Sequence, residues 1–140
     1  MYEKIIVATD GSETAKAAVE HAADVARMAG SNEVVVAHVC PACTPELDPD
    51  SKNRKTASKI VNDAGEAVAS EGVLVRTILE MDYPPEEVGD ALLDIINNES
   101  ADLVILGSRG LSEFRGMLLG SISHKVIQHS KCPVLVIKAK

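Results

Sequence analysis

The sequence predicts one α/β domain, a doubly wound five-stranded parallel sheet in the order 3-2-1-4-5 with helices on both faces. Three observations lead to this prediction. Short apolar runs alternate with longer segments whose apolar residues recur at helical spacing. Hydrophobic residues make up 46% of the chain but aromatic residues only 2%, so Ala, Val, Ile and Leu must build the core, as suits helices packed on a parallel sheet. The length, residues 1–140, is that of a single domain.

The first expected strand is the apolar run from Lys4 to Ala8, which a Thr-Asp-Gly sequence brings to a turn. Ser12 is expected to cap the helix that follows, since a serine oxygen can accept a hydrogen bond from a first-turn amide. Alanines and valines then recur at helical spacing until Gly30, a residue type favoured just past a helix end. This part of the chain therefore predicts a strand, a tight turn and an amphipathic helix.

A second strand is expected from Val34 to Val39. Three prolines within residues 40–49 argue against regular structure after it, because proline fixes φ and lacks a backbone N–H. The second helix is expected to begin behind Asp50 or Ser51 and to close at Gly72. The longest loop of the chain is thus expected between the second strand and the second helix.

The third strand, from Val73 to Leu79, is expected at an edge of the sheet because Arg76 interrupts its apolar pattern. Pro85 is expected to open the third helix, where a missing N–H has no consequence. The fourth strand covers Asp102 to Leu106, and the fifth covers Val134 to Ile137. Strands that alternate with helices in this way predict a parallel sheet with helices on both faces.

A glycine-rich segment separates the fourth strand from the last helix, which is expected over residues 122–129. Its glycines are Gly107, Gly110 and Gly120, and Ser121 follows the third. Glycines let backbone N–H groups approach an anion, and a helix N-terminus adds donors and the positive end of a dipole. Ser121 lies where a hydroxyl could cap the helix or contact a phosphate oxygen. From these residues alone, phosphate binding and a plain strand-to-helix turn both remain open.

Ligands of parallel α/β sheets bind beyond the carboxyl ends of the strands, where the strand order reverses. Asp10, Val39 and Gly107 each lie at such an end, so one ligand could contact all three. By residue type alone, Asp10 is either an acceptor for ribose hydroxyls or a turn aspartate, and Val39 can simply be an apolar strand end. His38 is interpreted as a structural strand residue outside the site.

The spacing G-x2-G-x9-G-S from Gly107 to Ser121 resembles the nucleotide-binding signature of the universal stress protein family. The resemblance extends to the opening KIIVATDGSETAKAAVEHA, to His38-Val39 and to the closing CPVLVIK, so it covers essentially the whole chain. It implies a Rossmann-like fold of the adenine nucleotide α-hydrolase-like kind. The function it implies is that of an ATP-binding universal stress protein, a nucleotide-binding regulatory module in the stress response.

The resemblance also implies which residues bind the nucleotide. The carboxylate of Asp10 would contact the nucleotide, and the backbone of Val39 would contact adenine. Residues 120–122 would receive the triphosphate, and residues 107–110 would lie near the ribose and the phosphates. The implied ligand is ATP, or ADP or AMP, with Mg²⁺. The complete set comprises Ala8, Thr9, Asp10, Val39, Gly107, Ser108, Arg109, Gly110, Gly120, Ser121 and Ile122.

Two other functions remain open. A slow ATPase or self-phosphorylating enzyme would need a carboxylate that holds a metal and a residue that positions the nucleophile. Asp10 is the only acidic residue expected near the phosphates, so we name no catalytic residue and expect at most very slow hydrolysis. A thiol redox protein would use Cys40 and Cys43, but a proline-rich loop follows them instead of the helix N-terminus that would stabilise a thiolate. No second pair of ligands supports a metal site there.

Composition and charge limit the partners. The formal net charge of −7 argues against nucleic acid. No apolar run approaches the roughly 18 residues of a membrane span, and the N-terminus lacks a signal-peptide layout, so we expect a cytoplasmic protein. The last strand, Val134 to Ile137, carries neither charge nor proline, and such an edge invites another strand. We therefore expect a homodimer through this strand, which is also how the family commonly assembles.

Overall fold

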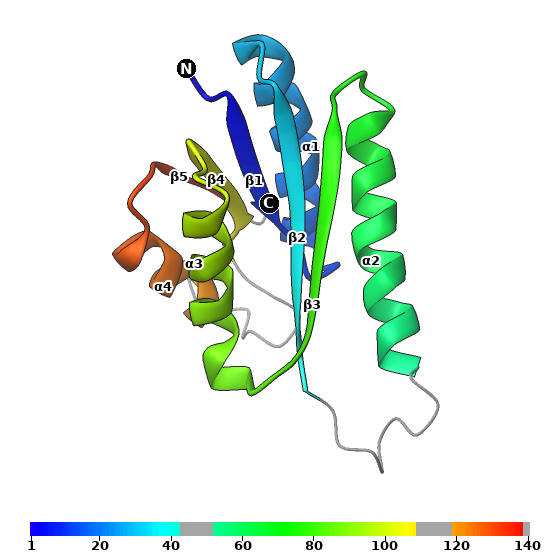
Figure 1. The fold of residues 1–140 in the computed structure, drawn as a ribbon, viewed down its shortest axis with the longest axis vertical. Coiled ribbons are helices and arrows are strands. Elements are labelled where there is room, and N and C mark those ends of the chain that lie inside the picture. The colour runs from blue at the N-terminus through cyan, green and yellow to red at the C-terminus, as the bar shows by residue number, and fades with distance from the viewer. Residues whose placement is uncertain (43–51, 109–118, 139–140) are drawn as a thin grey trace.

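The computed structural model describes residues 1–42, 52–108 and 119–138 and confirms the predicted fold class. Five parallel strands form one sheet in the order β3-β2-β1-β4-β5. Figure 1 shows α1 and α2 on one side of this sheet and α3 and α4 on the other. The strands are β1 (Lys4–Ala8), β2 (Glu33–Pro41), β3 (Val75–Tyr83), β4 (Leu103–Gly107) and β5 (Val134–Ile137).

The helices are α1 (Glu13–Ala29), α2 (Lys52–Ala69), α3 (Val88–Asn98) and α4 (Ser121–His129). Both predicted caps of α1 are confirmed: the Ser12 hydroxyl accepts a hydrogen bond from the Ala15 amide, and Gly30 adopts a left-handed φ of 65°. Asp50 and Ser51, the expected caps of α2, lie outside the described residues. Pro85 opens a short 3-10 turn, Pro85–Glu87, that leads directly into α3.

An apolar cluster on each face holds the layers together, and alternation along the strands assigns each side chain to its face. Ile5 and Val7 of β1 pack with α1 and α2, whereas Ile6 between them packs with α3. All three side chains are fully buried. Helix α1 contributes small residues such as Ala18 and Ala22, which let its backbone approach the sheet. The expectation of a core built from Ala, Val, Ile and Leu is thereby confirmed.

The ends of β2 and β3 differ from the prediction. Strand β2 continues through Cys40 to Pro41, although the prolines were expected to exclude regular structure there. A proline is compatible with a strand end at which its missing N–H is not needed. Strand β3 begins two residues later than expected and runs on to Tyr83, past Asp82, whose φ is 69°. The pairing of the two strands is irregular between Val39 and Pro41, so their ends do not follow simple alternation.

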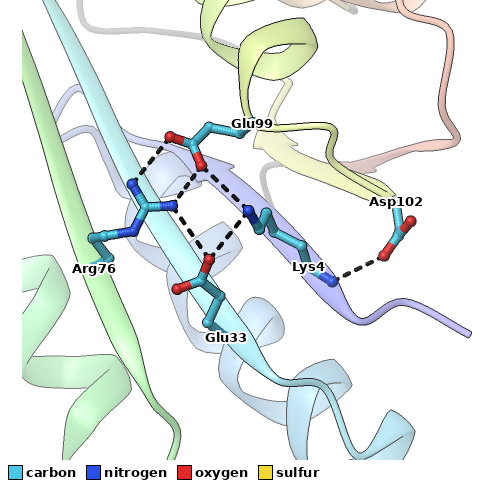
Figure 2. A network of polar contacts seen from close by, with 5 residues as sticks. All are labelled: Lys4, Glu33, Arg76, Glu99 and Asp102. Atoms are coloured by element: carbon cyan, nitrogen blue, oxygen red, sulfur yellow. Dashed lines mark hydrogen bonds and ion pairs between the residues drawn. The ribbon is translucent and has the colours of Figure 1, made fainter.

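Figure 2 shows a network of charged side chains at the amino end of the sheet. Arg76 of β3 donates from Nη1 to Oε1 of Glu99 at 3.0 Å and from Nη2 to Oε1 of Glu33 at 3.2 Å. The Nζ of Lys4 lies 3.4 Å from a carboxylate oxygen of each of the same two residues. The hydrogen bonds from Arg76 are the main reason that the pKa of Glu33 and that of Glu99 are lowered. The network thus links β1, β2, β3 and the end of α3.

Arg76→Ala is expected to lower the free energy of unfolding by about 1 kcal/mol at neutral pH, the scale of a partly exposed ion-pair network. Folding lowers the pKa of both carboxyl groups, so the native state binds fewer protons than the unfolded state. The stabilisation is therefore present above their ordinary pKa of 4.5 and is lost progressively as the pH falls from there through the lowered native-state pKa values. Urea unfolding of the wild type and the variant at neutral pH and near pH 3 measures both effects.

The matched control is Arg27→Ala, because Arg27 forms ion pairs with Asp24 and Glu71 whose side chains are about half exposed. Such pairs contribute little, so the control should change stability by less than about 0.5 kcal/mol. A loss for Arg76→Ala that persists near pH 3, or an equal loss for the control, would contradict a stabilising role for the network.

Candidate functional site

A pocket lies at the carboxyl ends of β1, β2 and β4, where the order of the strands reverses on either side of β1. This reversal is the position at which doubly wound sheets bind their ligands. The walls come from the strand ends, from the first turns of α1 and α4 and from α3. The lining residues are Ala8, Thr9, Asp10, Ala15, Ala37, Val39, Val88, Leu92, Leu106, Gly107, Gly120, Ile122 and Ser123.

The pocket brings together most of the residues that the sequence assigned to the site. Ala8, Thr9, Asp10, Val39, Gly107, Gly120 and Ile122 all line it. Ser108 is buried beside the pocket with 2% of its surface exposed, and Ser121 is exposed at the start of α4; neither lines the pocket. Arg109 and Gly110 lie outside the described residues, so their assignment stays a prediction.

Sequence reasoning missed the apolar wall and one polar residue. Helix α3 contributes Val88 and Leu92, which belong to the apolar cluster on that face of the sheet. The pocket reaches them because α3 covers the same face of the sheet as α4. Alternation along β2 identifies Ala37 as a companion of Val39, so that residue could have been found from the sequence. Ser123 follows the glycine motif by two residues, and spacing alone gave no signal for it.

Asp10 is both a turn residue and a pocket residue. One carboxylate oxygen, Oδ1, accepts a hydrogen bond from the Ser12 amide at 2.9 Å. Gly11 between them has a φ of 83°, and its amide donates to the Thr9 hydroxyl at 3.2 Å. Asp10 is therefore a turn residue that also lines the pocket, and its contact with a ribose stays a prediction.

The N-cap of α4 is Gly120, so the expectation that Ser121 could cap this helix is wrong. Gly120 has extended backbone angles, and its carbonyl accepts the His124 amide at 2.9 Å. Its own N–H donates to the Ser108 carbonyl at 2.6 Å and is therefore already engaged. An anion at this helix end could therefore not use the Gly120 amide without breaking its bond to Ser108.

His38 points to the face of the sheet opposite the pocket and does not line it. Only 5% of its surface is exposed, and this burial lowers its pKa, while a hydrogen bond to the Thr9 backbone and the charge of Asp10 act in the opposite direction. Within the part of the chain that the structure describes, its Nδ1 atom has no hydrogen-bond partner. Burial therefore favours the neutral form of the ring.

The metal-ligating residues, the cysteines and the helices within the described ranges 1–42, 52–108 and 119–138 each bear on the candidate function. No group of three or more His, Cys, Asp or Glu residues there could hold a metal ion. Cys40 lies in β2, whereas Cys43 falls outside the described residues. No helix in those ranges is long and apolar enough to cross a membrane.

The fold and the place of its pocket define the chain as a Rossmann-like α/β domain. Residues 1–138 match the model of the Universal stress protein family. The chain belongs to the universal stress protein family, which confirms the resemblance drawn from its sequence. The match therefore extends well beyond the glycine motif.

Three similar proteins illustrate the relationship. Universal stress protein YxiE of Bacillus subtilis is 32% identical, over 99% of this chain and 100% of its own. A universal stress protein solved in complex with cAMP has a TM-score of 0.72 and 26% identity, and the match covers 99% of this chain and 98% of the other. The universal stress protein from Archaeoglobus fulgidus, solved in complex with dAMP, has a TM-score of 0.75 and 25% identity, with 98% of each chain covered.

Proposed function

We propose that this protein binds an adenine nucleotide, foremost ATP with Mg²⁺, and acts in the cytoplasm as a regulatory module of the stress response. One observation carries the proposal: a single pocket joins Asp10, Val39 and the first turn of α4 at the reversal of strand order. Two relatives bind adenine nucleotides, cAMP in one and dAMP in the other, which supports the same ligand class here. ADP and AMP belong to the same proposal.

The pocket offers three kinds of surface that match the three parts of a nucleotide. Side chains of β2, β4 and α3 form an apolar wall against which a base can stack. The carboxylate of Asp10 would accept hydrogen bonds from ribose hydroxyls. The first turn of α4 presents amides and the positive end of a helix dipole to the phosphates, and Arg109 in the preceding segment would pair with them. Mg²⁺ would enter with the phosphates, which supply oxygen ligands of the kind it prefers.

Asp10→Ala is expected to weaken ATP binding by about 1–3 kcal/mol, because a ribose hydroxyl would lose its charged acceptor. Asp10→Asn is the matched control, since it keeps an oxygen for the Ser12 amide and the turn. If only the turn matters, the Asn variant binds like the wild type, whereas a role for the charge weakens both variants. Calorimetry with ATP measures the effect. Wild-type protein that binds no adenine nucleotide at millimolar concentration would refute the proposed function itself.

The ribose contact has a second test, because deoxynucleotides lack one hydroxyl each. If Asp10 accepts from the ribose, the 2′-deoxy or the 3′-deoxy form should bind the wild type more weakly than the ribose form. That difference should shrink in Asp10→Ala. Equal binding of all three forms to the wild type would remove the ribose contact from the proposal while leaving adenine nucleotide binding in place.

We also propose that the protein forms a homodimer through β5. Among the described strands, β5 ends the sheet and pairs with β4 on one side. Leu135 is 37% exposed and Ile127 of the neighbouring α4 is 43% exposed, so apolar surface accompanies the open edge. A two-fold axis beside β5 would pair it with its copy in an isologous contact. Such pairing would satisfy the backbone groups that an unprotected edge leaves unbonded.

Leu135→Lys is expected to shift the protein from dimer to monomer without unfolding it. Leu135 is the variant of choice because it points outward, whereas Val136 packs against the core cluster on the α3 face. Leu74→Lys is the control, since Leu74 is 68% exposed and directly precedes the opposite edge strand β3. Analytical ultracentrifugation at tens of micromolar gives the masses. A monomeric wild type, or a dimer that survives Leu135→Lys, would contradict this interface.

A further inference from the structure

Helix α4 is held in place by few buried side chains. Among its nine residues, only Ser123 and Val126 are buried. Val126 packs in the core beneath the middle of the helix, and Lys125 forms an ion pair of 2.7 Å with Asp90 of α3. The middle of the helix is therefore fixed by packing and by charge. Its first turn, which lines the pocket, needs other contacts.

Two hydrogen bonds fix the first turn to the end of β4. The hydroxyl of Ser123, which is 5% exposed, donates to the Gly107 carbonyl at 2.6 Å. The amide of Gly120 donates to the next carbonyl, that of Ser108, also at 2.6 Å. Ser108 is itself tied to the sheet, because its amide donates to the Ile137 carbonyl of β5 at 2.8 Å. We call this pair of bonds the α4 clasp.

We infer that Ser123 is a positioning residue for the phosphates of the nucleotide, an inference that rests on the proposed function. The Ser123 hydroxyl already donates its hydrogen bond to the Gly107 carbonyl, so the role of Ser123 is to orient the helix end. Of the two clasp bonds, only this one comes from a side chain, so mutation can remove it without altering the backbone. Hydrogen bonds weaken steeply when donor and acceptor lose alignment, so a loosened first turn presents its amides to a phosphate less well. The base and the ribose lie against other walls and do not depend on this turn.

Ser123 should affect the binding of the phosphate but not that of the base and the ribose. AMP and adenosine differ only by the phosphate, so a comparison of their affinities measures this effect. Ser123→Ala should bind AMP about tenfold more weakly than the wild type, the scale of one hydrogen bond. Its affinity for adenosine should stay within about twofold. A general weakening of the fold would lower the affinity for both probes alike, so the ratio of the two affinities identifies a positioning role. Calorimetry on the full-length protein gives both values.

Ser130→Ala is the matched control. Ser130 stands at the opposite end of α4, and its hydroxyl also donates to a backbone carbonyl, that of Cys132, at 3.1 Å. Loss of this bond should leave the affinities for AMP and adenosine within about twofold of the wild type. Ser123→Thr restores a hydroxyl at position 123 and should recover AMP binding.

A second measurement tests the clasp without any ligand. Hydrogen exchange at the amides of Gly120 and His124 should accelerate in Ser123→Ala, while exchange in β1 and β4 stays unchanged. Unaltered exchange at these amides would overturn the clasp even if the wild type bound no nucleotide. An equal loss of AMP and adenosine affinity, or an AMP affinity kept within twofold, would overturn the positioning role. Failure of the wild type to bind AMP would refute the proposed function instead, and the exchange result would still decide the clasp.

Discussion

Gly107→Ala is expected to lower the free energy of unfolding by about 3 kcal/mol, the upper part of the range for overpacking a tight contact. A Cβ atom at this position would lie 2.4 Å from Oγ1 of Thr14 and 2.8 Å from its carbonyl carbon. The second distance matters more, because a side chain can rotate away but the backbone of the first turn of α1 cannot. Strand β4 and α1 would have to separate at the point where both line the pocket.

Gly89→Ala is the control for this prediction. A Cβ atom there would lie 2.9 Å from Cδ of Lys125, the far part of a flexible side chain that can move. Gly89 also lies within α3, where alanine is favoured over glycine by up to about 1 kcal/mol. Urea unfolding should therefore show a loss for Gly107→Ala and little change or a gain for Gly89→Ala. Equal stabilities for the Gly107 variant and the wild type would show that α1 adjusts at no cost.

The fold could be predicted because local and long-range signals agree along most of the chain. The apolar runs around Ile6 and Val35 are too short for helices and carry no polar break, so they indicate strands buried on both faces. Ser12 and Gly30 mark the ends of α1 in the sequence and in the structure. Arg76 indicated an edge strand, and its strand does lie at an edge. Each of these features depends on residues close in sequence.

The features that could not be predicted depend on contacts between distant segments. The end of β3 is bonded to the residue that follows β2: the Ala42 amide donates to the Tyr83 carbonyl at 2.6 Å, and no local pattern indicates that contact. Gly107 was interpreted as a residue that lets an anion approach, and the structure adds a packing reason for it, because its lack of a side chain leaves room for Thr14 of α1. The sequence contains both residues but not their proximity, which arises only when the helix docks on the sheet.

The candidate site shows the same division. The convergence of Asp10, Val39 and Gly107 could be predicted, because carboxyl ends of parallel strands meet at one edge of a sheet. The contribution of α3 could not, because it depends on how that helix lies across the sheet. The engaged amide of Gly120 could not either, because its acceptor on Ser108 is separated from it by the loop. The motif therefore located the helix end that lines the pocket, and the structure shows which of its amides is already engaged.

Gly120→Val is expected to weaken AMP and ATP binding by at least about a hundredfold, or ~3 kcal/mol, while the domain stays folded. Gly120 is buried and lines the pocket with backbone alone, so a branched side chain would add volume at the wall that faces the phosphates. Its φ of −73° and ψ of 165° are extended angles that valine adopts without strain, so the cost to stability should remain near 1 kcal/mol. Gly120→Ala, with a single methyl group, should lose affinity by an intermediate factor at similar stability. Calorimetry and urea unfolding on the three proteins separate the effects, and wild-type affinity in the valine variant would place the phosphates away from this helix end.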